Sequence, residues 1–166
     1  FLLCAKLRTS DIDGSAGSLD EVKRIVARIK KRWPKTKFVL RADSGFARDE
    51  IMTWCEGNEV DYIFGLAKNG RLEKMIVAEL ETVKQEAAKT GAAARTFREL
   101  RYRTLDSWSC ERRVVAKAEH LGDKSNPRFV VSSFSVERYD ARALYEDLYC
   151  ARGDMENRIK EQQLAL

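Results

Sequence analysis

The chain has 166 residues, of which 44% are hydrophobic and 34% are charged; this argues against long disorder and fits one domain. Its 31 lysines and arginines outnumber its 26 aspartates and glutamates, and the net charge of +5 favours a polyanionic partner. No apolar run approaches the roughly 20 residues of a membrane span, so we expect no membrane partner. No two cysteines form a CxxC pair, and we therefore expect reduced, mostly buried thiols in a cytoplasmic protein.

The N-terminal region predicts a strand followed by a helix. Residues 1–8 are apolar and precede a turn-rich segment, which indicates a short strand. A helix is then expected from an N-cap at Ser18 to Pro34, because the apolar residues between them recur at helical spacing. Its end, Lys30-Lys31-Arg32, complements the helix dipole, with a DNA contact as the alternative interpretation.

The next segments alternate between strand and helix. We predict a strand at 37–42, an exit turn at 43–45, a helix at 47–56, a strand at 60–66 and a long helix at 71–89, from apolar periodicity and turn residues. This alternation indicates an α/β fold with a largely parallel sheet.

The second half of the chain changes character. Three β-prone runs, 100–104, 112–118 and 128–134, are separated by turns and predict antiparallel strands of a β-rich insertion, the last of which can rejoin the main sheet edge. A final helix is expected to begin at an N-cap residue, Asp140.

Two carboxylates stand out as candidates for chemistry. Asp43 follows a buried strand, where open α/β sheets bind their ligands. Glu156 lies in the final helix, and at about 100° per residue Tyr149, Arg152 and Lys160 share its polar ridge within roughly 80°. A glutamate so placed can hold a divalent ion while the cations neutralise phosphates. The pair therefore predicts part of a divalent-metal site.

Each carboxylate also has a structural interpretation. Asp43 can form an Asx turn before Gly45, and the ridge around Glu156 can be a solvent-facing row of ion pairs. A two-metal site needs at least one more carboxylate than this pair supplies. Asp11 and Asp13 are favoured as turn-formers.

Two stretches carry a resemblance to a known family. FVLRADSGF (38–46) and LYCARGDMENRIKE (148–161) resemble the DDE transposases of bacterial insertion sequences, in the branch with a tyrosine, arginine and glutamate signature. The resemblance implies a ribonuclease H-like mixed sheet flanked by helices with a β-rich insertion. It also implies three acids that bind two Mg²⁺ or Mn²⁺ ions and cut and join double-stranded DNA.

The resemblance assigns roles to individual residues. Asp43 matches the second acid and Glu156 the third, whereas the first acid and its strands are expected upstream of this chain. Tyr149 and Arg152 match positions that contact DNA, and Lys160 is the substitute for a family lysine whose position holds Gln162.

The resemblance also predicts the organisation of the chain. Residues 1–70 are the first part of the core, 71–127 a helix plus the β-rich insertion, and 128–166 the last core strand and helix. We expect an interior fragment that is inactive alone, and a homo-oligomer in the active synaptic complex.

Two questions stay open at the level of sequence. Trp108 in the insertion is a candidate for stacking on a DNA base, whereas Trp54 is favoured as a core residue. The alternative functions are a non-catalytic basic DNA-binding fragment and a ribonuclease H-like nuclease.

Overall fold

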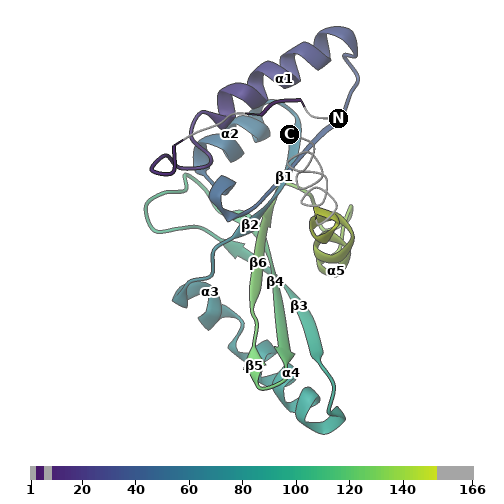
Figure 1. Ribbon diagram of the computed structural model, residues 1–166. Coiled ribbons are helices and arrows are strands. Elements are labelled where there is room, and N and C mark those ends of the chain that lie inside the picture. Colours follow the sequence, from purple (N-terminus) through teal and green to yellow (C-terminus); the bar gives the residue numbers. More distant parts are fainter. Residues whose placement is uncertain (1–2, 6–8, 153–166) are drawn as a thin grey trace, which may run out of the picture.

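A computed structural model describes residues 3–5 and 9–152, with the side chain of Arg152 excepted (Figure 1). Its elements in chain order are α1 (Ser18–Arg32), β1 (Phe38–Ala42), η1 (Ser44–Phe46), α2 (Asp49–Gly57), β2 (Val60–Leu66), α3 (Gly70–Met75), α4 (Val77–Thr90), β3 (Ala94–Tyr102), β4 (Arg112–Leu121), β5 (Lys124–Ser125), β6 (Arg128–Ser132), α5 (Ala141–Ala143), η2 (Leu144–Tyr149) and η3 (Cys150–Arg152).

The strands form one mixed sheet. Their order is β1-β2-β6-β4-β3, with the short β5 beside β4. β1 and β2 are parallel, with Phe38 opposite Val60, and the other described pairs are antiparallel. The prediction of a mixed sheet flanked by helices is confirmed, but the expectation of a largely parallel sheet is wrong. β3 and β4, expected in an insertion, share this sheet with β1 and β2.

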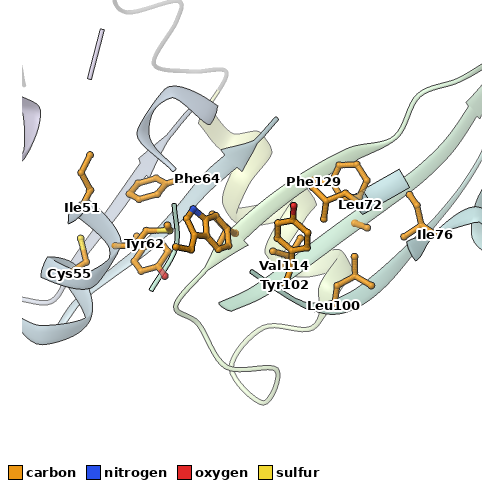
Figure 2. Close-up of a cluster of buried hydrophobic side chains, with 14 of the residues drawn as sticks. Ile51, Cys55, Tyr62, Phe64, Leu72, Ile76, Leu100, Tyr102, Val114 and Phe129 are labelled. Carbon is orange, nitrogen blue, oxygen red and sulfur yellow. The ribbon is translucent and has the colours of Figure 1, made fainter. Parts of the chain in front are cut away.

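Both faces of the sheet are covered, which explains why its central strands are apolar at consecutive positions. Successive side chains of a strand point to opposite faces. On β2, Tyr62 and Phe64 enter the larger core cluster with residues of α1 to α4, whereas Ile63 enters a smaller cluster on the other face. Figure 2 shows the larger cluster, in which Ile51 of α2 and Leu72 of α3 meet the strands.

The helices are arranged along the length of the sheet. Figure 1 shows α1 and α2 at the end that holds β1, α4 beside β3 and β4 towards the other end, and α5 apart from both. No helix within the described residues combines the length and the apolar character needed for a membrane span.

Several predicted element bounds need correction. A strand was expected at 1–8, but Leu3–Ala5 are not in a strand. The other residues of that range, 1–2 and 6–8, lie outside the described residues. Gly17, in the left-handed region at φ 66°, is the N-cap of α1, and Ser18 is its first helical residue. The helix expected at 71–89 is interrupted at Ile76, a fully buried residue whose φ of −122° leaves the helical region.

Only one of the four cysteines is buried. Cys55 lies in the larger core cluster, and burial raises its pKa to about 12. The other three are exposed, so the expectation of mostly buried thiols is wrong, and none of the four is in a disulfide.

Arg112 of β4 fastens α2 to the sheet. Its side chain is 3% exposed and donates hydrogen bonds of 2.7 to 3.1 Å to Asp49, Thr53 and Glu56 of α2. Although burial alone would raise the pKa of Glu56, hydrogen bonds from Arg112 and Tyr62 lower it. Burial would likewise raise the pKa of Asp49, but hydrogen bonds from Ser109 and Arg112 lower it.

The next residue, Arg113, makes the corresponding contacts on the other face. It is 7% exposed and donates to the Glu99 carboxylate of β3 and to the carbonyl oxygens of Phe134, Ser135 and Tyr139. These carbonyls belong to the segment that leads from β6 into α5. Arg113 therefore fixes the start of the final helix against the sheet.

The final helix begins as predicted and then changes type. Asp140 is its N-cap, with Oδ1 accepting a hydrogen bond from the Ala143 N–H at 2.8 Å. After three α-helical residues it becomes a π-helix, in which the Cys150 N–H donates to the Tyr145 carbonyl five residues back. Such π segments are rare and frequent at functional sites, and the 100° per residue used in the sequence prediction does not apply to residues 144–149.

Candidate active site

Asp43 lies directly after the carboxyl end of β1. Its carboxylate oxygen Oδ1 accepts a hydrogen bond from the Gly45 N–H at 2.9 Å, which makes it the N-cap of η1. The Asx turn considered from the sequence is therefore present. Asp43 is exposed, and none of the described residues donates a hydrogen bond to the other oxygen, Oδ2. The turn occupies one oxygen and leaves the other for a ligand.

A cavity of about 440 Å³ opens beside Asp43. It lies at the carboxyl ends of the parallel strands β1 and β2, where open α/β sheets bind ligands, and at the start of β6. Burial raises the pKa of Tyr145, on its wall, to about 12. The lining residues are Asp43, Ser44, Gly65, Leu66, Ala67, Lys68, Pro127, Arg128, Phe129, Tyr145 and Tyr149.

Gly65 allows three parts of the site to meet. A Cβ atom on Gly65 would lie 2.6 Å from the Tyr149 hydroxyl oxygen, 3.1 Å from the Ser44 nitrogen and 3.4 Å from the Asp43 carbonyl carbon. Ordinary contacts of a Cβ atom begin at 3.4 Å. A side chain at position 65 would therefore require Tyr149 or the turn at Ser44 to shift, because the Tyr149 hydroxyl occupies the space where a Cβ atom would lie.

Arg41 joins strand β1 to the helical segment η2. Its Nη1 donates a hydrogen bond of 2.7 Å to the Leu148 carbonyl of η2. Arg41 precedes Asp43 by two positions and Leu148 precedes Tyr149, so this contact fixes β1 against the helix turn that carries Tyr149. Neither Arg41 nor Gly65 was singled out from the sequence, although an arginine and a glycine inside apolar strand runs are signals that could have marked them.

Two cations lie on the rim of the cavity. Lys68 follows β2 and Arg128 begins β6, and both are exposed. Lys68 Nζ is 4.0 Å from Glu73 Oε1, and no ion pair of Arg128 is found within the described part of the chain. Neither residue was singled out from the sequence, because isolated basic residues in turns are common.

Trp108 lies in the core in this structure. It is 5% exposed, its Nε1 donates to the Ala47 carbonyl at 3.4 Å, and its ring meets that of Tyr102 edge-on. In this position neither ring face is open for a DNA base. Trp54 packs against the larger core cluster as expected.

The remaining predicted site residues cannot be placed in the cavity. Glu156 and Lys160 lie outside the described residues, as does the side chain of Arg152. Of the predicted site residues, the structure brings together Asp43 and Tyr149.

The described residues contribute only part of a metal-binding set. Asp43 is a hard oxygen ligand of the kind that Mg²⁺ and Mn²⁺ take, and it fits such an ion. Within the described ranges no three Asp, Glu, His or Cys side chains gather to hold one. Asp13 is a turn-former as expected, with Oδ1 accepting from the Ser15 N–H at 2.8 Å.

A comparison with protein families identifies the chain. All of it, residues 1–166, matches the family described as Transposase DDE domain group 1. The chain belongs to this family. No curated protein and no solved structure matches it. Membership of this transposase family implies DNA cleavage and strand transfer in transposition, and a polynucleotidyl transferase or nuclease chemistry.

Proposed function

We propose that this protein supplies the second and third acids of a DDE transposase, Asp43 and Glu156, which cleave DNA and transfer its strands with Mg²⁺ or Mn²⁺. One observation carries the proposal. Asp43 stands at the carboxyl end of β1 in a 440 Å³ cavity that Tyr149 of the final helix also lines. Tyr149 precedes Glu156 by seven positions, so the proposed second acid lies at the same cavity as the first residues of the signature segment.

The metal would be held by Asp43 and Glu156 together with an acid from another segment. When bound, such ions lower the pKa of a water or a 3′-hydroxyl and stabilise the leaving 3′ oxygen. Asp43 is suited to this role because the Gly45 N–H fixes Oδ1 and thereby orients Oδ2. The Arg41 guanidinium, bonded to the Leu148 carbonyl, fixes β1, the strand that leads into that turn, against the final helix.

DNA would enter along the cationic rim of the cavity. Lys68 and Arg128 are exposed there, and we propose that they neutralise phosphates next to the scissile bond. Arg152 and Lys160 are proposed to contact DNA from the signature segment. A stacking role for Trp108 requires that the side chain first leave the core position it holds in this structure.

We also propose a ribonuclease H-like core, with the first acid on a strand outside these 166 residues. The outer position of β1 supports this proposal, because β1 is the last strand of the described sheet and pairs with β2 on one side. An added strand there would bring its side chains next to Asp43. The division at residues 70 and 127, the insertion-sequence origin and the oligomeric synaptic complex stay predictions.

The test uses a longer protein that includes the upstream segment. Asp43→Ala and Glu156→Ala should each abolish Mg²⁺-dependent cleavage of transposon-end DNA while DNA binding is retained, and the 166-residue chain alone should not join strands. Asp123→Ala, in the exposed turn between β4 and β5, is the matched control and should stay active.

Three results would contradict the proposal. Cleavage by the Glu156→Ala enzyme would remove Glu156 from the site. Cleavage without strand joining by the longer protein would favour the nuclease, and binding without cleavage would favour the non-catalytic DNA-binding fragment.

A further inference from the structure

The strongest concentration of positive charge in the chain lies on α1 and the loop that follows it. Residues 22–37 contain eight lysines and arginines and no acidic residue. Arg24 pairs with Glu21, and Lys30 donates to the Asn58 carbonyl. The other six are exposed and have no ion-pair or hydrogen-bond partner among the described residues; these six, which we call the α1 basic face, are Lys23, Arg28, Lys31, Arg32, Lys35 and Lys37.

The packing of α1 aims these charges at solvent. Val26 is 5% exposed and belongs to the larger core cluster, with Leu19 and Val22 packed beside it. At about 100° per residue, Arg28 and Lys31 lie on the side of the helix opposite Val26. Figure 1 shows α1 at the end of the molecule beside α2, well away from α4. Trp33, 61% exposed, adds an aromatic surface at the end of the helix.

Stabilisation of the helix does not explain this arrangement. The helix dipole favours cations only within the last turn, which accounts for Lys31 and Arg32 but not for Lys23 before that turn or Lys35 after it. Like charges four residues apart on a helix destabilise it, and Arg28 and Arg32 are such a pair. A surface of this kind is expected where a polyanion neutralises the charges.

We propose that the α1 basic face binds the phosphate backbone of duplex DNA and extends the DNA path beyond the Asp43 cavity. The inference rests on the proposed function, which supplies DNA as the polyanion. Lysine and arginine contacts to phosphates fix the position of the duplex without reading its sequence. The contact is therefore independent of sequence, and donor-end and target duplexes both satisfy it.

The experiment measures how the affinity of the 166-residue chain for DNA depends on salt. Fluorescence anisotropy follows binding to a duplex of arbitrary sequence, about 30 base pairs long, between about 50 and 200 mM salt. The test variant is Arg28→Gln/Lys31→Gln/Lys35→Gln. The slope of log K against log salt is negative, and each lost phosphate contact makes it shallower by about 0.9. The triple variant should therefore have a slope shallower by about 2.7, and its affinity near 150 mM salt should fall by on the order of 100-fold.

Two further variants separate the face from general charge and from folding. Lys74→Gln/Lys84→Gln/Lys89→Gln removes the same charge from exposed positions of α3 and α4 and should leave the slope unchanged. Arg28→Lys/Lys31→Arg/Lys35→Arg keeps the charge and should keep the slope. Thermal unfolding of each variant shows whether it is folded.

The outcomes are distinct from those of the catalytic test. A wild-type slope in the α1 variant, or an equal change of slope in the Lys74/Lys84/Lys89 control variant, overturns the inference even if the longer protein is an active transposase. With a wild-type slope, an acidic protein would be the next binding partner to test. A slope lowered only in the α1 variant supports the inference even if Asp43→Ala turns out to be active.

Discussion

Gly65→Ala would place a methyl group where the Tyr149 hydroxyl now lies. The new Cβ atom would be 2.6 Å from that oxygen, about 0.8 Å short of ordinary contact, and 3.1 Å from the Ser44 nitrogen. Overpacking of this kind typically costs about 1–3 kcal/mol of stability. If Tyr149 or the Asp43 turn moves by about 1 Å in response, catalysis should fall by up to about 100-fold.

A double-mutant cycle shows whether the hydroxyl is the cause. Urea unfolding would give the free-energy change for Gly65→Ala in the wild-type chain and again in Tyr149→Phe, which lacks the clashing oxygen. We expect most of the loss to disappear in the second background, with the contact to Ser44 accounting for what is left. Gly70→Ala is the control, because no atom lies within 4 Å of the added Cβ. Equal losses in both backgrounds would refute the placement of Tyr149 over Gly65.

Three other predictions concern the stability and chemistry of the core. Arg112→Met should destabilise the protein by about 2–3 kcal/mol in urea unfolding, less than the roughly 3–5 kcal/mol of a fully buried broken ion pair, because solvent reaches its carboxylate partners. A loss no larger than that of the exposed Arg101→Met would contradict it. The pKa values of Glu56 and Asp49 are lowered in the folded state, so the unfolded chain takes up protons at these carboxylates first as the pH falls. Their contribution to the free energy of unfolding should be complete above about pH 4.5 and should decline below it. The decline should be less steep in Arg112→Met. The Cys55 thiol, with its pKa raised to about 12 by burial, should react with a disulfide reagent near pH 8 only on unfolding, whereas the exposed thiols react in the native chain; rapid reaction of all four would show that α2 opens readily.

The elements that sequence predicts well are those whose signals are local. β2 (Val60–Leu66) agrees at both ends, because an apolar run lies between the turn residues Asn58 and Asn69. The Asp140 N-cap was equally clear, since its carboxylate bonds within its own turn. Asp43 was correctly placed at a strand end for the same reason.

The errors arise where distant contacts decide. Nothing local marks Ile76 as a helix break, because its conformation accompanies complete burial in the core. The stacking role considered for Trp108 is untested, but the sequence could not show that the side chain is buried between Tyr102 and Ala47. The π-helical stretch likewise escapes a prediction built on a constant angle per residue. The part of the site formed by Gly65, Arg41 and Tyr149 depends on contacts between β1, β2 and η2, which only the fold brings together.

The adjacent arginines of β4 have a consequence for how the molecule opens. Arg112 holds α2, which follows the Asp43 turn, and Arg113 holds the segment that leads into the helix of Tyr149. Because neighbouring strand residues point to opposite faces, one dipeptide anchors both halves of the site at the same point of the sheet. Fraying of either layer therefore disturbs the strand that secures the other, and the two walls of the cavity are expected to be lost in a single cooperative event rather than one after the other.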